Sequence, residues 1–252
     1  MGTDVDGNLM RRRLIGGLMA VLWVGCWGKA PLPSQTPRHN EKEAVRETTA
    51  MESLFVVHVE QDGLRCDLRG YVLKAGVHDG ITYPCDHLVV TYTLENQAAV
   101  PCYVFNRGHS NARSTLGYVE QRAAGVVELS QKACLPPPDC PPTYVPVLPR
   151  VSVLNPGGRQ TESVYFELPL KAHTPFDFCF SESETAPLTG AQMEFRLGYL
   201  RADEAGGEDG VQMPEQVREN DTLPAELARR QRFLSSGVQA LPSGAVRPVA
   251  PQ

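Results

Sequence analysis

Between residues 52 and 202 the chain consists of short apolar stretches separated by turn residues, and this pattern restricts the fold more than any other feature. The stretch "HLVVTYTLEN", residues 87–96, alternates regularly. One face of it carries Leu88, Val90, Tyr92 and Leu94. Because successive side chains of a β-strand point to opposite faces, this period predicts a strand with one face in a hydrophobic core.

Eight to ten strands of this kind are predicted, and no long amphipathic helix lies between them. They fall within residues 53–61, 65–73, 87–96, 100–108, 116–130, 149–158, 162–170, 176–183 and 191–202. The clearest core-facing sets are Val164, Phe166 and Leu168; Phe176, Phe178 and Phe180; and Met193, Phe195, Leu197 and Tyr199. A parallel sheet needs crossover connections, usually helical, so the pattern predicts an all-β, antiparallel β-sandwich, immunoglobulin-like in the broad sense.

The stretch "VVTYTLENQAAVPCYVF", residues 89–105, adds a family resemblance. It resembles the strand-Asn-x-x-x-x-Pro-strand hairpins of bacterial immunoglobulin-like envelope domains. The resemblance covers 17 residues and implies a sandwich rather than a barrel.

The N-terminus has the features of an export signal. Arg11, Arg12 and Arg13 precede an uncharged stretch, residues 14–24, which is too short for a transmembrane helix of about 20 residues. Either Met1 or Met10 could be the start.

The segment Leu22-Trp23-Val24-Gly25-Cys26 resembles the lipobox of bacterial lipoproteins, although Trp23 stands where that family usually has Leu. The resemblance implies that Cys26 is lipid-modified and becomes the mature N-terminus. A cleaved secretory signal with an unmodified cysteine and an uncleaved anchor are the alternatives.

These features divide the chain into four parts. Residues 1–25 are predicted to be a signal peptide, 26–51 a flexible tether rich in Pro, Thr and charge, and 52–202 the β-sandwich domain. Residues 203–252 are predicted to hold an acidic linker, a short helix and a disordered tail. For the helix, Thr222 is the expected N-cap, Pro224 lies just inside, and Gly237 marks the stop.

Six cysteines remain when Cys26 is set aside: Cys66, Cys85, Cys102, Cys134, Cys140 and Cys179. An even number in an exported chain is compatible with three disulfides. The pair Cys134–Cys140, which closes the short loop "CLPPPDC", is the local pairing that we predict. Zinc is the rival use of these thiols, but no Cys-x-x-Cys motif is present.

Motifs for catalysis are weak, and we predict neither an enzyme nor a cofactor or metal site. "GHSNA", around Ser110, comes within one residue of the Gly-x-Ser-x-Gly nucleophile elbow, but no helical pattern follows it. Cys85, Asp86 and His87 are three potential ligands in a row, yet adjacent strand residues point to opposite faces.

The remaining function class is binding. The net charge is −5 and basic residues are not clustered beyond the N-terminal arginines, which argues against nucleic acid as a partner. The segment "CLPPPDCPPTYVPVLPR" is stiff and proline-rich, and we expect its Pro136, Pro137 and Tyr144 to contact a partner protein; a stiff crossover loop is the alternative.

The expected protein is therefore a lipid-anchored, non-catalytic binding module of the bacterial cell envelope, with its domain in the periplasm or at the cell surface. An immunity-type or inhibitor protein that neutralises an effector is one version. A structural or accessory lipoprotein of an envelope assembly is the first alternative, and a hydrolase with an unrecognised site is the second.

Overall fold

The computed structural model describes residues 53–111, 116–122, 125–140, 146–179, 188–204 and 216–246. The chain divides into two units, residues 1–47 and 48–252, and every described residue belongs to the second. The predicted signal peptide, Cys26 and the whole of the predicted tether lie outside the described residues. Among the residues that are described, no helix is long and apolar enough to span a lipid bilayer.

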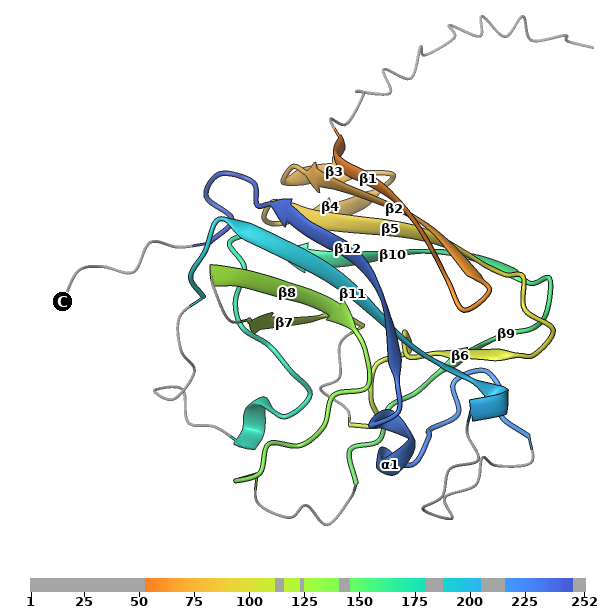
Figure 1. Cartoon of the computed structure of the whole chain (residues 1–252). Helices are drawn as coiled ribbons and strands as arrows, with labels where there is room; N and C mark the ends of the chain where they lie inside the picture. Colours follow the sequence, from red (N-terminus) through yellow and green to blue (C-terminus); the bar gives the residue numbers. More distant parts are fainter. Residues whose placement is uncertain are drawn as a thin grey trace, which may run out of the picture. The chain divides into compact units, whose positions relative to one another are not determined.

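Two sheets form the second unit (Figure 1). The first sheet is antiparallel throughout, in the order β1-β2-β5-β10. Its strands are β1 (Ser53–Gln61), β2 (Leu64–Leu73), β5 (His87–Asn96) and β10 (Arg159–Glu167). A small hairpin of β3 (Gly76–His78) and β4 (Ile81–Tyr83) connects β2 to β5.

The second sheet has the order β7-β8-β11-β6-β9, and β12 also pairs with β11. Its strands are β6 (Cys102–Val104), β7 (Tyr118–Gln121), β8 (Val126–Gln131), β9 (Ser152–Leu154), β11 (Gln192–Arg201) and β12 (Arg232–Ala240). The helical elements are one turn each: η2 (Asp177–Cys179), η3 (Ala202–Glu204) and α1 (Ala225–Ala228). The protein is thus all-β, as the sequence predicts.

One apolar core joins the two sheets. The alternating residues of β5 and β11, which the sequence assigned to core faces, are buried in the same cluster. These are Leu88, Val90, Tyr92 and Leu94 from β5, and Met193, Phe195, Leu197 and Tyr199 from β11. Since β5 belongs to the first sheet and β11 to the second, the two sheets bury their apolar faces against each other.

The second sheet is mixed, which corrects the expectation of a purely antiparallel fold. β8 pairs with β11 in parallel, from Gln192 opposite Val126 to Leu197 opposite Gln131. A parallel pair needs a long connection, and the described residues of this one form β9, β10 and the single turn η2. The sequence argument wrongly assumed that a crossover without a helix would not occur.

The predicted C-terminal helix is mostly wrong. It is confined to α1, with Pro224 and not Thr222 at the N-cap, and the rest of the segment forms β12. Gly237 sits in a β-bulge, where Ser236 and Gly237 lie between the pairs Arg196↔Ser235 and Glu194↔Val238. Its φ of 64° is the left-handed conformation that both a helix stop and a bulge glycine require, so the sequence signal was ambiguous.

The predicted strand at residues 176–183 is also corrected. Phe176 is buried and Phe178 is exposed, but Asp177–Cys179 forms the one-turn helix η2, and Phe180 lies outside the described residues. Thr174 and Asp177 bond to each other across this turn, which favours local closure over strand pairing.

Candidate functional site

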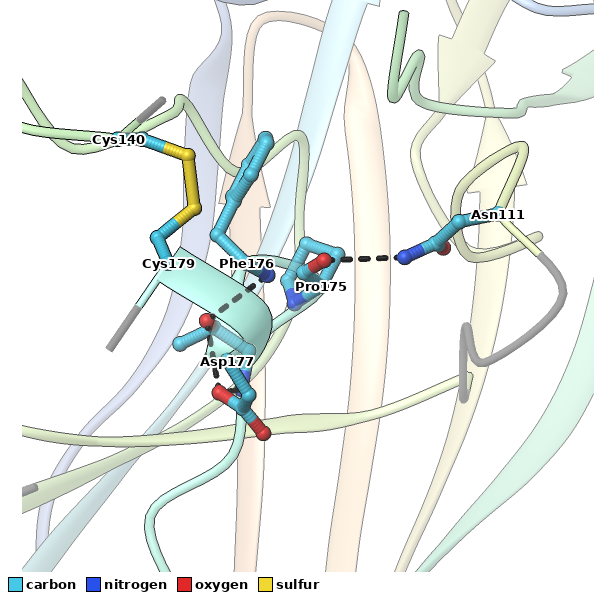
Figure 2. The surroundings of a disulfide bond; sticks show 7 residues. Asn111, Cys140, Pro175, Phe176, Asp177 and Cys179 are labelled. Carbon is cyan, nitrogen blue, oxygen red and sulfur yellow. Dashed lines mark hydrogen bonds between the residues drawn. A yellow bond between two sulfur atoms is a disulfide. The ribbon is translucent and has the colours of Figure 1, made fainter. Parts of the chain in front are cut away.

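A disulfide joins Cys140 to Cys179, with the two Cα atoms 4.9 Å apart (Figure 2). This corrects the predicted Cys134–Cys140 pair. Cys134 is buried instead beside Tyr118 and Phe176, in a small apolar cluster against which the disulfide packs. The predicted local pairing fails because Cys134 belongs to this cluster and Cys140 reaches a partner 39 residues later in the sequence.

The other cysteines of the described residues are free thiols. They are Cys66, Cys85, Cys102 and Cys134. Burial raises the pKa of both Cys66 and Cys102 to about 12, so these two thiols stay protonated at neutral pH. The expected set of three disulfides is therefore reduced to one within the described part of the chain.

The segment that carries Cys179 is held by polar side chains (Figure 2). Asp177 Oδ1 accepts a hydrogen bond of 2.7 Å from the backbone N–H of Thr174, and Thr174 Oγ1 accepts one of 3.1 Å from that of Phe176. The Asn111 side-chain amide donates to the carbonyl of Pro175 at 3.0 Å. These bonds fix the turn from which the disulfide reaches the proline-rich segment.

The disulfide links two short exposed segments, residues 135–140 and Asp177–Cys179, which we call the stapled surface. Pro136 is exposed and Pro137 is half-buried, and the carbonyl of Pro137 accepts a hydrogen bond from the Cys140 N–H at 3.0 Å. Each segment exposes one large apolar side chain, Leu135 at 42% and Phe178 at 45%. The third predicted contact, Tyr144, lies outside the described residues.

A depression of about 290 Å³ lies next to the stapled surface. Its lining includes Leu135, Pro137, Phe176 and Phe233, together with the charged Glu120 and Lys132. The surface is therefore apolar with ionic groups at its side, which is the composition of many protein interfaces.

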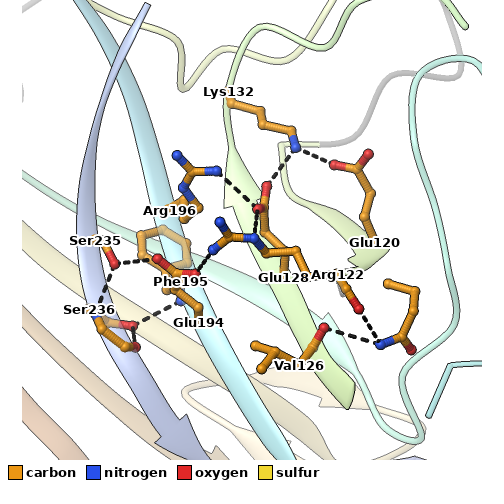
Figure 3. A network of polar contacts seen from close by, with 12 residues as sticks. Glu120, Arg122, Val126, Glu128, Lys132, Glu194, Phe195, Arg196, Ser235 and Ser236 are labelled. Atoms are coloured by element: carbon orange, nitrogen blue, oxygen red, sulfur yellow. Dashed lines mark hydrogen bonds and ion pairs between the residues drawn. The ribbon is translucent and has the colours of Figure 1, made fainter. Parts of the chain in front are cut away.

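The ionic groups belong to a network across β7, β8 and β11 (Figure 3). Glu128, only 3% exposed, accepts from Lys132 at 2.5 Å and from Arg196 at 3.2 Å. Burial opposes the ionisation of Glu128, but the two cations outweigh it and hold the pKa of its carboxyl below the usual value. The Arg196 guanidinium also lies 3.8 Å from the centre of the Phe233 ring.

Ser110, the serine of the elbow-like motif, has a structural role here. Its hydroxyl donates to the Pro146 carbonyl at 3.0 Å and accepts from the Leu148 N–H at 2.9 Å. The neighbouring His109 is buried, accepts from the Cys134 N–H at Nε2 and lies 2.6 Å from the Tyr118 hydroxyl through Nδ1. These contacts join the loop to the Cys134 cluster.

A larger groove, of about 560 Å³, follows the outer edge of β10. Gly117 approaches this strand so closely that an added Cβ would lie 2.7 Å from Val164 and 2.8 Å from Phe166. The lining mixes apolar side chains such as Val119 and Pro169 with Lys171 and Glu167.

The fold and the stapled surface define an all-β protein of two sheets with a disulfide-linked apolar surface. No protein-family model matches the chain, and the searches of curated proteins and of solved structures find no match either. The Cys140–Cys179 bond and the exposure of Phe178 had no signal in the sequence, because the two segments are distant and are brought together only by the fold.

Proposed function

We propose that the chain is a lipid-anchored protein of the bacterial cell envelope, whose immunoglobulin-like β-sandwich binds a partner protein through the stapled surface. The export signal and the lipobox-like segment ending at Cys26 support the location. The two sheets around one core support the sandwich. An immunity-type or inhibitor protein that occupies an effector in the periplasm fits these features.

The observation that carries the binding role is the pair Leu135 and Phe178, two exposed apolar side chains on segments joined by a covalent bond. Large apolar side chains at the centre of an interface supply much of its binding free energy. Because the disulfide and the prolines already restrict these segments, little conformational entropy is lost when a partner binds.

Site-specific photocrosslinking in living cells tests the surface. A photoreactive residue is placed at Leu135, at Phe178, or at Val56 of β1, which is 59% exposed and serves as the control. We expect the photoreactive residue at Leu135 and at Phe178 to crosslink to the same envelope protein. At Val56 we expect no crosslink to that protein.

The crosslinked partner is then purified and its binding is measured by calorimetry. Leu135→Asp and Phe178→Asp should each weaken the affinity at least tenfold, because each buries a charge in place of an apolar anchor. Val56→Asp should leave it unchanged. Unaltered binding by both surface variants would overturn the assignment of this surface.

The anchor has a separate test. Palmitate labelling is compared between the wild-type chain and Cys26→Ala, and we expect the label only in the wild type. Equal labelling of the two chains would contradict the lipid attachment at Cys26.

A further inference from the structure

A group of three potential metal ligands lies at one end of the first sheet. His87 begins β5 and pairs directly with Glu167, the last residue of β10. Cys85 lies in the bend between β4 and β5, two residues before His87. One ligand atom each from Cys85, His87 and Glu167 lies within 4.8 Å of the other two.

One nitrogen of the His87 imidazole is engaged by the backbone. Its Nδ1 lies 2.8 Å from the carbonyl oxygen of Cys85. A carbonyl can only accept, so Nδ1 carries a proton, and in the neutral imidazole the lone pair is then on Nε2. Metal-binding histidines commonly have this arrangement, with the second nitrogen bonded to a carbonyl or carboxylate.

His87 Nε2 has no hydrogen-bond partner among the described residues, although the side chain belongs to a residue only 8% exposed. The thiol of Cys85 and the carboxylate of Glu167 likewise have no hydrogen bond or ion pair within the described part of the chain. Three donors of different kinds thus converge without being used by the fold.

Aromatic rings cover the group. The ring of Tyr83, at the end of β4, lies edge-on 5.2 Å from His87 and stacks on Tyr165 of β10 at 5.9 Å. His78 of the same hairpin contacts Tyr83 at 5.8 Å. These ring contacts restrict the orientation of the imidazole, whereas the carboxylate of Glu167 is exposed.

Asp86, which the sequence places between the other two candidates, is occupied elsewhere. Its carboxylate accepts from Lys74 at 2.8 Å and from the Ala75 N–H at 2.8 Å. The sequence argument considered only Cys85, Asp86 and His87. It missed Glu167, which replaces Asp86 as the third ligand through the register of β5 and β10.

We propose that Cys85, His87 and Glu167 bind a zinc ion. Sulfur, nitrogen and oxygen ligands together suit Zn²⁺, whereas Ca²⁺ and Mg²⁺ prefer oxygen alone. In a tetrahedral site, zinc bonds of about 2.0–2.3 Å place the ligand atoms about 3.3–3.8 Å apart. Side-chain rotations that move these atoms by about 1 Å therefore complete the site. A thiolate and a carboxylate neutralise the charge of the ion, and water fills the fourth position.

Binding requires the Cys85 thiol to lose its proton, because the thiolate is the ligand. One proton is therefore released to the buffer for each zinc ion bound. The loss of this proton release in Cys85→Ser distinguishes coordination by Cys85 from binding of zinc to other groups.

The test titrates the purified full chain, freed of metal, with Zn²⁺ by calorimetry in buffers of different ionisation enthalpy. We expect one ion per chain and release of one proton. Cys85→Ser and Glu167→Gln should each weaken the affinity at least tenfold and leave circular dichroism unchanged, since neither side chain is buried in the core. Cys85→Ser should also abolish the proton release.

His58→Gln is the matched control. His58 lies on the same sheet, 2.6 Å from the carboxylate of Asp67, but no cysteine faces this exposed pair. The His58→Gln variant should bind zinc with the same affinity as the wild type. Co²⁺ gives an independent readout, because a thiolate ligand produces a charge-transfer band in the near ultraviolet that Cys85→Ser should remove.

Equal zinc affinity of wild type, Cys85→Ser and Glu167→Gln would overturn the proposal. So would a Co²⁺ complex of the wild type without the thiolate band. Neither result depends on the stapled surface, so the partner-binding proposal stands or fails separately.

Discussion

At the scale of single residues, His109 couples the fold to pH. It is 1% exposed, and burial lowers its pKa from 6.5 to about 4. The unfolded chain therefore binds one more proton than the folded chain between these two pH values. Stability contributed by the neutral imidazole is complete above pH 6.5 and is lost progressively as the pH falls toward 4.

This predicts a loss of about 3 kcal/mol in the free energy of unfolding over that range from His109 alone. Urea unfolding at a series of pH values measures it. The glutamine of His109→Gln keeps a donor and an acceptor but does not titrate. Between pH 6.5 and 4, the free energy of unfolding of this variant should therefore fall by about 3 kcal/mol less than that of the wild type. Parallel pH profiles for the two chains would show that His109 is not the coupled group.

At the scale of elements, β12 is the strand whose contribution is least evident from the sequence. Leu234 is 1% exposed in the core that both sheets share, whereas Val238 of the same strand is 52% exposed. We predict that Leu234→Ala lowers the free energy of unfolding by about 2–5 kcal/mol, because it leaves a cavity in the core. Val238→Ala should change it by less than about 0.5 kcal/mol. Chemical denaturation of both variants gives the comparison, and equal small effects would mean that β12 does not close the core.

The sequence predicts long strands with regular alternation well and predicts their partners poorly. β5 and β11 were correctly identified because four alternate apolar side chains on each leave one interpretation. β3 and β4 were missed because three residues are too short to show a period. For β12, the apolar residues fit a helical period as well as a strand, and only pairing with β11 decides between them.

The candidate sites follow the same rule. Pro136 and Pro137 could be chosen as candidates because a proline-rich composition is visible locally. The partner of Cys140 and the position of Glu167 opposite His87 depend on register and on contacts between distant segments. A single sequence does not encode these in any local pattern, because alternation specifies a face but not a neighbour.

At the scale of the whole molecule, the disulfide closes a loop between residues 39 positions apart. Its removal in Cys140→Ala/Cys179→Ala should lower the free energy of unfolding by about 4 kcal/mol, because the unfolded chain gains the entropy of an open loop. Peptide mapping without reduction should recover the fragments of Cys140 and Cys179 linked.

The control is Cys134→Ala, which should leave this linkage intact. If mapping instead joins Cys134 to Cys140, the pairing in the structure is not the one that forms. If reduction of the wild type leaves its stability unchanged, the bond does not constrain the unfolded chain.

The central position of β11 also determines the order in which the protein can be completed. β6, β8 and β12 all pair with β11, whereas every strand of the first sheet precedes it in the chain. A chain that emerges from its N-terminus during synthesis or export can assemble β1, β2, β5 and β10 early. The second sheet must wait for β11, which ends at Arg201, and it is complete only with β12, which ends at Ala240. Until then half of the core is exposed, and this interval is when proteases and aggregation act most strongly on the protein.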